Sequence, residues 1–317
     1  MADAYGRCLG YLRLSVTERC NLRCRYCMPE TGIEKKAHTE MLTEDEMIAA
    51  VEAAASLGVT KLRLTGGEPL VKKNILSIAE RAAKVPGIRE VCMTTNGTLL
   101  PAMAKPLRAA GVDRVNISLD TLDPDKFASI TRCGRFDDAM AGIRAALDAG
   151  FEKVKLNTVL IGGFNDDEIV ALTDLTRELP LTVRFIELMP MAPGSGFGPE
   201  QYVSADAVLN ALPELVPAEQ DGGVAKLYRL PGAMGEVGLI RPMTAHFCAS
   251  CNRLRLTADG KLKPCLHSPD EISVKGLSKE GMREAMTRAM ALKPQRRANL
   301  SATEFTGSAR SMDRIGG

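Results

Sequence analysis

Six of the nine cysteines in this 317-residue chain fall into two groups of three. The first group is Cys20, Cys24 and Cys27, in the segment RCNLRCRYC. A structural zinc ion normally takes four closed ligands, commonly from pairs of cysteines with two residues between them. This group has only three thiols, with three and then two residues between them, and no fourth Cys or His nearby. Three thiolates suit a [4Fe–4S] cluster that keeps one iron open, so we expect that kind of centre here.

The second group, Cys248, Cys251 and Cys265, has two and then thirteen residues between its members. A pair of cysteines two residues apart is common in zinc sites, and His246 or His267 could supply a fourth ligand. A second three-thiolate cluster is the other interpretation. The spacing alone leaves both open.

Four basic residues follow the second cysteine pair. Arg253 and Arg255 are two apart on a predicted strand, so their side chains point to the same face, and Lys261 and Lys263 repeat this on the partner strand. The face is either a solvated basic surface or a clamp for phosphate groups, which guanidinium groups bind through paired, charge-assisted hydrogen bonds. No G-x4-G-K-[ST] segment is present, which excludes a conventional P-loop nucleotide site.

Strand-like and helix-like segments alternate from about residue 11 to 190, which predicts βαβ units and a parallel sheet. Thr43 and Glu46 form a capping box at the start of the first expected helix, which should end at Gly58. Later helices are expected over 136–149 and 166–178. Six strands suit either an open doubly wound sheet or an incomplete barrel, because a full eight-stranded barrel takes about 250 residues. The expected strands begin at Tyr11, Lys61, Glu90, Arg114, Lys153 and Thr182.

A segment rich in Gly and Pro, starting at Ala192, marks a boundary between a first region, 1–194, and a second, 195–317. In the second region the sequence predicts a β-hairpin over 253–264, with a turn that contains Asp-Gly. A helix is expected over 278–292. The end of the chain, from Lys293 onward, is polar and is expected to be partly extended.

Composition and charge limit the classes of function. The net charge of +2 gives no general attraction to nucleic acid or acidic membranes, so any anion site must be local. No apolar run approaches the roughly 20 residues that span a bilayer, and the N-terminus does not look like a signal peptide. We therefore expect a cytoplasmic protein whose clustered cysteines bind metal. Cys8, Cys92 and Cys133 lie apart from both groups, as buried small side chains or inert surface thiols, and their roles stay open.

The first cysteine group, with Tyr26 before its last member, resembles the signature of the radical S-adenosylmethionine (SAM) superfamily. The resemblance implies that the open iron chelates the amino and carboxylate groups of SAM, and that an electron from the cluster cleaves SAM to methionine and a 5′-deoxyadenosyl radical. TGGEP, residues 65–69, looks like the motif that contacts the methionyl amine, and Glu68 can accept from an ammonium. Ser118 and Asp120, at the end of a predicted strand, resemble family positions that line the pocket.

The set of motifs as a whole, from Tyr11 to the terminal Gly316-Gly317, resembles the GTP 3′,8-cyclase family within that superfamily. The resemblance implies an α/β fold, an incomplete TIM-like barrel of six β/α units whose open side is closed by a C-terminal region with a second [4Fe–4S] cluster. The implied reaction converts GTP to (8S)-3′,8-cyclo-7,8-dihydroguanosine 5′-triphosphate, the first step of molybdenum cofactor biosynthesis. The radical removes hydrogen from ribose C3′, the ribose radical then adds to guanine C8, and a further electron and proton give the product.

The same resemblance implies the residues of the site, with the guanine of GTP bound at the open iron of the second cluster. Arg253, Arg255, Gly316 and Gly317 are implied as catalytic, although a Gly-Gly end taken alone is usually a frayed tail. In the family this tail reaches into the active site. The implied SAM contacts are Tyr26, Gly67, Glu68, Ser118 and Met189. The implied GTP contacts are Arg13, Lys61, Arg63, Thr94, Lys155, Arg253 and Arg255.

The implied partners are GTP as substrate, an electron donor and the downstream cyclic pyranopterin monophosphate synthase. A homodimer is suggested, and no nucleic acid or membrane partner is expected. Two other functions stay open. A peptide-modifying radical SAM enzyme would bring a longer, more Cys-rich C-terminal region, and a zinc-binding interaction module would do no chemistry.

Overall fold

The computed structural model describes residues 2–33, 36–191, 197–297 and 310–316. Within these residues one sheet runs through the molecule in the strand order β12-β11-β10-β1-β2-β3-β4-β5-β6-β9-β8-β7. The strands from β10 to β9 in that order are all parallel to their neighbours. Their bounds are β1 (Tyr11–Ser15), β2 (Lys61–Thr65), β3 (Glu90–Thr95), β4 (Arg114–Ser118), β5 (Lys153–Leu160), β6 (Leu181–Glu187), β9 (Glu236–Ile240) and β10 (Arg253–Leu256).

The sheet is an incomplete barrel. The six strands of the first region follow one another around the sheet in sequence order, without the reversal that defines a doubly wound fold. Antiparallel strands finish the two edges, and among the described residues the order does not return to its start, so the barrel stays open between its end strands β12 and β7. The edge strands are β11 (Lys261–Lys263) and β12 (Ile272–Ser273) on one side, and β8 (Lys226–Arg229) and β7 (Val216–Pro217) on the other.

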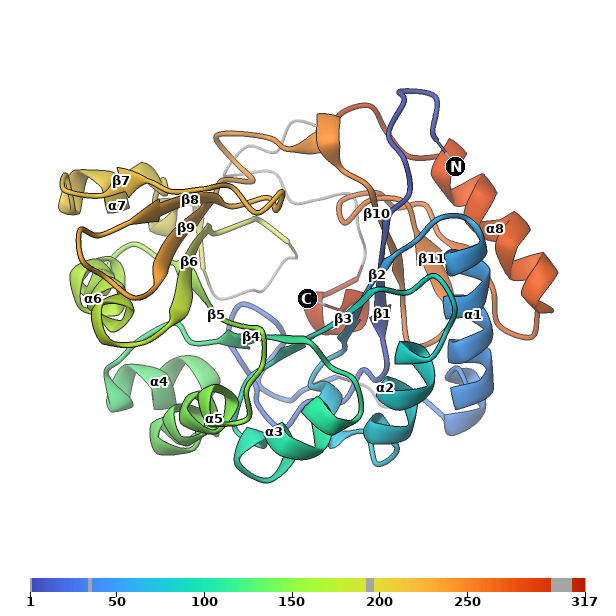
Figure 1. Ribbon diagram of the computed structural model, residues 1–317, viewed down its shortest axis with the longest axis horizontal. Helices are drawn as coiled ribbons and strands as arrows, with labels where there is room; N and C mark the ends of the chain where they lie inside the picture. The colour runs from blue at the N-terminus through green and yellow to red at the C-terminus, as the bar shows by residue number, and fades with distance from the viewer. Residues whose placement is uncertain (1, 34–35, 192–196, 298–309, 317) are drawn as a thin grey trace.

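Helices cover the outside of the curved sheet (Figure 1). The predicted capping box is confirmed at the first of them, because the Thr43 hydroxyl accepts from the Glu46 amide and the Glu46 carboxylate accepts from the Thr43 amide. Gly58 follows that helix with a φ of 99°, as the sequence predicts. The helices are α1 (Glu44–Ser56), α2 (Ile75–Ala83), α3 (Leu100–Ala109), α4 (Pro124–Thr131), α5 (Phe136–Asp148), α6 (Ile169–Glu178), α7 (Asp206–Ala211), α8 (Lys279–Ala291) and α9 (Met312–Ile315). None of these helices combines the length and apolar character needed to cross a bilayer.

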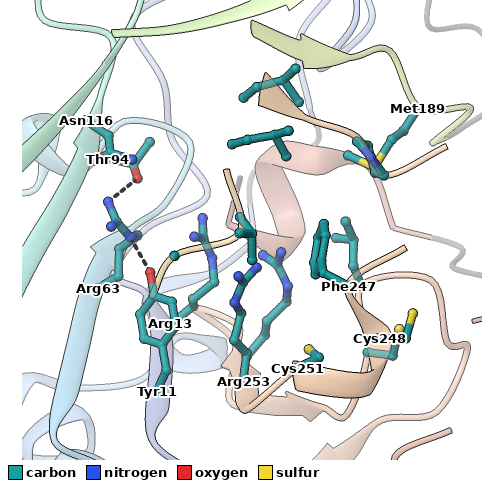
Figure 2. A pocket seen from close by; sticks show the side chains of 18 of the residues that line it. Tyr11, Arg13, Arg63, Thr94, Asn116, Met189, Phe247, Cys248, Cys251 and Arg253 are labelled. Carbon is teal, nitrogen blue, oxygen red and sulfur yellow. Dashed lines mark hydrogen bonds between the residues drawn. The ribbon is translucent and has the colours of Figure 1, made fainter. Parts of the chain in front are cut away.

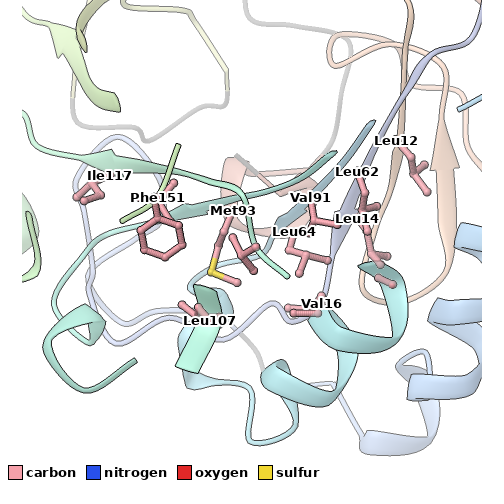
Figure 3. Close-up of a cluster of buried hydrophobic side chains, with 14 of the residues drawn as sticks. Leu12, Leu14, Val16, Leu62, Leu64, Val91, Met93, Leu107, Ile117 and Phe151 are labelled. Carbon is pink, nitrogen blue, oxygen red and sulfur yellow. The ribbon is translucent and has the colours of Figure 1, made fainter. Parts of the chain in front are cut away.

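Three neighbouring strands share an alternating pattern that sets the inside and outside of the barrel. β1, β2 and β10 read YLRLS, KLRLT and RLRL. Successive side chains of a strand point to opposite faces, so the leucines share one face and the basic residues the other. The leucines are buried against the helical layer, as Figure 3 shows for Leu12, Leu14, Leu62 and Leu64. The basic residues therefore point into the barrel.

The second region is built into the same sheet. Its strands β9 and β10 flank the six strands of the first region, and the predicted hairpin is confirmed by the antiparallel pairing of Arg255 with Lys263. The predicted helix over 278–292 is confirmed as α8, with Ser278 as its N-cap. The predicted boundary at residue 194 lies outside the described residues.

The segment that is expected to be partly extended contains a short helix near its end, and residues 298–309 of it lie outside the described residues. Met312–Ile315 form the short helix α9, because the carbonyl of Ser311 accepts from the amides of Arg314 and Ile315. Ile315 is buried, and Figure 1 places the C-terminal end inside the ring of strands. A single turn is too short to leave a helical period in the sequence.

Candidate functional site

The first cysteine group lies on the loop that follows β1, at the edge where parallel strands present their carboxyl ends. The TGGEP segment packs on this loop. The Gly67 amide donates to the Thr17 carbonyl at 2.9 Å, and the Glu68 amide donates to the Arg19 carbonyl at 2.8 Å. A Cβ on Gly67 would lie 2.6 Å from the Arg19 carbonyl oxygen. The glycine is therefore needed for contact with the backbone of the cysteine loop.

Glu68 joins two loops rather than standing free. Its carboxylate accepts from the Leu70 amide at 2.9 Å, from the Thr95 hydroxyl at 2.8 Å and from the Asn96 amide at 2.6 Å. The side chain is buried, and burial raises the pKa of Glu68 to about 7. These three donors tie the TGGEP segment to the loop after β3. Glu68 thus shapes the edge of the site, and its carboxylate is already engaged before any ammonium approaches.

Tyr26 reaches across the mouth of the barrel from the cysteine loop to β4. Its hydroxyl donates to the Asp120 carboxylate at 2.6 Å, and the other oxygen of Asp120 accepts from the Val159 amide at 2.9 Å. Burial raises the pKa of Asp120 to about 6. This contact fixes the position of the loop between Cys24 and Cys27. Ser118, at the end of β4, is partly exposed at the same edge.

Burial also raises the pKa of the first three thiols, that of Cys20 to about 11 and those of Cys24 and Cys27 further. Metal coordination deprotonates such thiols outright. Among the described residues no three Cys, His, Asp or Glu side chains converge on a point where one ion could bind. A structural zinc ion takes four closed ligands, whereas three thiolates on one loop suit a four-iron cluster that keeps one iron open.

The hairpin of β10 and β11 assembles the second cysteine group. Cys251 lies two residues before β10. In the hairpin Arg255 pairs with Lys263. If this register continues for two more residues, Cys265 lies opposite Arg253. Burial opposes ionisation of Cys251, but the charges of Lys293 and Arg253 outweigh it and lower the pKa of this thiol. The two cations favour the thiolate that a metal centre requires.

A cavity of about 330 Å³ opens beside this second group. All three of its cysteines line the cavity, together with inward-facing residues of β1, β2, β3, β4, β5, β6, β9 and β10. In Figure 2 the side chains of Arg13, Arg63 and Arg253 extend towards this space, with Cys248 and Cys251 at one side. Arg63 donates to the Tyr11 hydroxyl and, at 3.2 Å, to the Thr94 hydroxyl. Tyr11 thus orients a cation of the cavity wall.

Positive charge in the cavity wall far exceeds negative charge. The cations are Arg13, Lys61, Arg63, Arg114, Arg184, Arg253, Arg255, Lys293 and Arg297, and among the described lining residues the single carboxylate is Asp221. Burial and the charge of Arg255 lower the pKa of Arg13 to about 9, and burial with Arg253 lowers that of Arg255 to about 10. Burial is the larger cause of both shifts and the neighbouring arginines the smaller, and a guanidinium stays protonated at neutral pH. Such a wall is a site for a polyanion.

Most of the expected GTP contacts line the cavity, but Lys155 does not. Its Nζ lies 2.6 Å from the carboxylate of Asp221, and the lysine is buried behind that residue. Lys155 therefore contacts Asp221, which is itself a residue of the cavity wall. Met189, expected beside SAM, lines this cavity instead of the loop of the first cysteine group. Lys261 and Lys263 do not line it, and Lys263 pairs with Glu271 at 3.2 Å.

Several cavity residues were not among the expected contacts. They are Arg114, Asn116, Asn157, Arg184, Lys293 and Arg297. Arg114 and Arg184 continue the inward row of polar side chains onto β4 and β6, and the Nε of Arg184 is buried without a hydrogen-bond partner among the described residues. Polar residues at every second position of otherwise apolar strands are the signal that could have found them.

The C-terminal turn closes the cavity from inside the barrel. Met312 lines the cavity, and the Gly316 carbonyl accepts from Arg255 at 2.9 Å. A Cβ on Gly316 would lie 2.4 Å from the Thr65 hydroxyl, at the end of β2. Gly317 lies outside the described residues. The turn therefore sits between the basic cavity and the edge that carries the first cysteine group.

The two cysteine groups flank the barrel at opposite ends of one strand. Tyr11 starts β1 beside Arg253 and the second group, and Ser15 ends it just before the loop of the first group. Five residues of strand span roughly 16 Å. Two ligands held at the two ends would therefore meet within the barrel. Of the three remaining cysteines, Cys92 is buried on β3, Cys8 is exposed, and Cys133 is exposed beside the loop of the first group, where its thiol donates to the Asn21 carbonyl at 3.4 Å.

Comparisons with known proteins agree with this geometry. Residues 14–176 match the family described as the radical SAM superfamily, and residues 181–299 match the one described as Molybdenum Cofactor Synthesis C. Among solved structures, SuiB of Streptococcus suis bound to S-adenosylmethionine aligns with a TM-score of 0.63 at 14% identity, over 87% of this chain and 68% of that one. Methylornithine synthase aligns with a TM-score of 0.53 at 18% identity, over 65% and 62%. These likenesses show the fold.

Curated relatives are much more similar in sequence. A GTP 3′,8-cyclase of Pelotomaculum thermopropionicum is 51% identical, and one of Moorella thermoacetica is 46% identical, each over the full length of both chains. Both carry the same name, and the two family matches follow one another along this chain as its two cysteine groups do. The chain therefore belongs to the GTP 3′,8-cyclase family of the radical SAM superfamily.

Proposed function

We propose that this chain converts GTP to (8S)-3′,8-cyclo-7,8-dihydroguanosine 5′-triphosphate, in the first step of molybdenum cofactor biosynthesis. The observation that carries the proposal is the cavity wall of nine cations and one carboxylate beside three cysteines. A triphosphate requires several such cations, and guanidinium groups bind phosphate oxygens in pairs. Relatives up to 51% identical are named for this activity.

Two [4Fe–4S] clusters fit the cysteines of this chain. Cys20, Cys24 and Cys27 would hold the first, with SAM at its open iron, and Cys248, Cys251 and Cys265 would hold the second. Bound there, the first cluster and SAM supply a 5′-deoxyadenosyl radical that takes hydrogen from the ribose C3′ of GTP.

The chain's own residues bind, orient and shield the substrate. Arg253, Arg255, Arg13 and Arg63 would hold the triphosphate from three adjacent strands, and a guanine beside Cys251 would be held at the far end from SAM. Fixing both ends of GTP leaves one ribose face towards the first cluster, which converts a bimolecular hydrogen transfer into an oriented one. Lys61 and Thr94 complete this set, with Lys155 paired to Asp221.

The SAM side would be shaped by the loops at the carboxyl edge of the sheet. Tyr26, held by Asp120, and the Gly67-Glu68 segment would form the wall beside SAM, with Ser118 at its margin. Met189 lines the GTP cavity and would contact SAM only from that side. Gly316 and Gly317 would exclude water from the space between the two ligands.

The proposed reaction also implies an electron donor, a downstream enzyme and a cellular compartment. Reduction of the first cluster needs an external electron donor, and the cyclised nucleotide is the substrate of a downstream cyclic pyranopterin monophosphate synthase. The nine unpaired thiols favour a reducing compartment, so we place the enzyme in the cytoplasm. A homodimer and a division of the chain at residue 194 stay predictions.

The test is an isotope transfer. The protein, reconstituted with iron and sulfide without oxygen, is incubated with SAM, dithionite and GTP carrying deuterium at C3′. We expect 5′-deoxyadenosine that contains deuterium, together with an isomer of GTP cyclised between C3′ and C8. The Cys24→Ala variant serves as the control without SAM cleavage. Unlabelled 5′-deoxyadenosine with unchanged GTP would overturn the proposal, and bound zinc without iron would favour an interaction module.

A further inference from the structure

An arginine at the start of the C-terminal turn forms the densest ion-pair cluster in the described part of the chain. Arg310 Nη1 and Nη2 each lie 3.0 Å from a different oxygen of Asp259. Its Nε and Nη2 donate to the two oxygens of Glu271 at 2.6 and 2.9 Å. One guanidinium therefore binds two carboxylates, each through two hydrogen bonds. The side chain of Arg310 is 15% exposed, so water competes little for these bonds.

Both carboxylates belong to the part of the chain that carries the second cysteine group. Asp259 lies in the turn between β10 and β11, where it also accepts from the Thr257 hydroxyl. Glu271 directly precedes β12 and pairs with Lys263. Arg310 thus ties the C-terminal turn to the hairpin that bears Arg253, Arg255 and Cys265.

The cluster also reaches the loop of the first cysteine group. Lys36 forms an ion pair with Asp259 and lies 3.5 Å from Glu18. Glu18 itself lies 3.9 Å from Arg310. Three carboxylates, of Asp259, Glu271 and Glu18, thus lie close to the cations of Arg310, Lys36 and Lys263, and the charge of Arg314 also acts on Glu18. Arg310 pairs with both Asp259 and Glu271.

A rigid link connects Arg310 to the glycine in the cavity. The Ser311 carbonyl accepts from the Arg314 and Ile315 amides, and the Met312 carbonyl accepts from the Gly316 amide. The five residues from Met312 to Gly316 are therefore held in one hydrogen-bonded turn. An isolated turn of this length is not stable in water, so its position and its structure depend on what anchors it.

We propose that Arg310 is a positioning residue that anchors the C-terminal turn, so that Gly316 meets Arg255 and the turn closes the space between the SAM and GTP sites. This inference rests on the proposed GTP cyclisation. Without Arg310, the turn would lose four charge-assisted hydrogen bonds to Asp259 and Glu271, which hold it against the hairpin. The cavity would then open to water although every cluster ligand is intact.

The experiment compares Arg310→Gln and Arg310→Lys with Arg283→Gln in the reconstituted holoenzyme. Arg283 pairs with Glu280 on the exposed face of α8 and controls for the loss of an arginine. Hydrogen–deuterium exchange is followed at the Arg314, Ile315 and Gly316 amides and in the hairpin 253–273. Iron content, cyclised GTP and 5′-deoxyadenosine are measured on the same samples.

We expect faster exchange at the three amides of the turn in Arg310→Gln, with unchanged iron and unchanged protection of the hairpin. Cyclisation should fall roughly 10- to 100-fold, because small losses of alignment cost that much, while 5′-deoxyadenosine is still released without product. Arg310→Lys should lie between this variant and wild type, because an ammonium cannot bind both carboxylates in pairs. Arg283→Gln should match wild type.

Three outcomes would overturn the proposal that Arg310 anchors the C-terminal turn. Exchange of the turn could stay slow in Arg310→Gln, cyclisation could stay normal while the turn exchanges freely, or iron and hairpin protection could fall together with activity. The last would make Arg310 a residue of the hairpin fold. A wild-type enzyme that makes no cyclised GTP would instead reject the proposed function, and the exchange data would still test the anchor.

Discussion

Arg255, on strand β10, donates a hydrogen bond of 2.9 Å to the carbonyl oxygen of Gly316 in the C-terminal turn. The same guanidinium lines the basic cavity together with Arg13 and Arg253. One side chain therefore contacts both the place where phosphate is expected and the turn that closes the cavity. Loss of either contact should uncouple SAM cleavage from GTP cyclisation.

Gly316→Ala should impair cyclisation without disturbing either cluster. Gly316 has a φ of 84°, and an added Cβ would lie 2.4 Å from the Thr65 hydroxyl oxygen and 3.1 Å from the Ser15 Cβ. The turn must move to make room for the methyl group, and we expect the yield of cyclised product to fall roughly 10-fold or more. Gly150→Ala is the matched control, because Gly150 has a φ of 70° and nothing within 4 Å of the added Cβ. Equal product from both variants would show that the approach to Thr65 is unimportant.

Arg255→Ala should weaken the use of GTP far more than the binding of SAM. A lost charge-assisted hydrogen bond is worth on the order of 1.5–3 kcal/mol, which is roughly a 10- to 100-fold loss in kcat/KM for GTP. Lys261→Ala is the control, because Lys261 lies on the adjacent strand of the same hairpin but does not line the cavity. Steady-state kinetics at varied GTP concentration, and separate measurements of SAM binding, are made on both variants and show which ligand each substitution affects. Unchanged GTP kinetics in Arg255→Ala would place the phosphate elsewhere in the cavity.

The local signals of the sequence were sufficient to predict the βαβ units and the parallel sheet, while the choice of an incomplete barrel came from the family resemblance. The capping box at Thr43 and Glu46 and the alternation of strands and helices depend on neighbours in the chain, and both appear as expected. These local signals could not predict the pairing of β10 with β1, because that pairing joins residues more than 200 positions apart. That pairing brings Arg253 and Arg255 next to Tyr11 and Arg13. The family resemblance implied only that a C-terminal region closes the open side of the barrel.

The C-terminal turn is another element that local sequence signals could not predict. No period in MDRI indicates a helix, since one turn contains too few residues, and its shape is set by burial of Ile315 and by the anchor at Arg310. The contact of Lys155 with Asp221 is another pairing that the sequence does not indicate, and the expected contact of Lys155 with GTP stays a prediction. Both depend on partners that are distant in the sequence.

Cys24→Ala should abolish reductive cleavage of SAM. The thiol is one of three on the loop after β1, and two thiolates cannot hold a four-iron cluster with one open site. We expect the iron content to fall by about half, with the second cluster retained. Cys8→Ala, at an exposed thiol outside both groups, is the control. Formation of 5′-deoxyadenosine above the cluster-free background by Cys24→Ala would exclude the first group as the SAM-cleaving centre.

Cys265→Ala should separate the two activities. Cys265 lines the basic cavity and follows β11, far from the loop of the first group. The first cluster should survive, so that 5′-deoxyadenosine still forms slowly, while cyclised GTP disappears. Iron analysis and both products measured in one assay check this. Normal cyclisation would mean that the second group holds no substrate-binding cluster.

Inorganic triphosphate should stabilise the holoenzyme by filling the cavity. Its charges would relieve the repulsion among the nine cations of the wall, which has Asp221 as its only described carboxylate. A ligand that binds only the folded state at a concentration 100 times its dissociation constant raises the free energy of unfolding by about 2.7 kcal/mol. The melting temperature, followed by circular dichroism, should therefore rise with added triphosphate.

Salt and a charge-removing variant are the controls for this rise. Since added salt screens charges over about 10 Å at 0.1 M, the rise should shrink as salt is added and should be smaller in Arg13→Gln. Guanosine, which lacks phosphate, should give a shift that salt does not change. A triphosphate effect that is absent, or that persists unchanged in high salt, would show that the cavity does not select its ligand by charge.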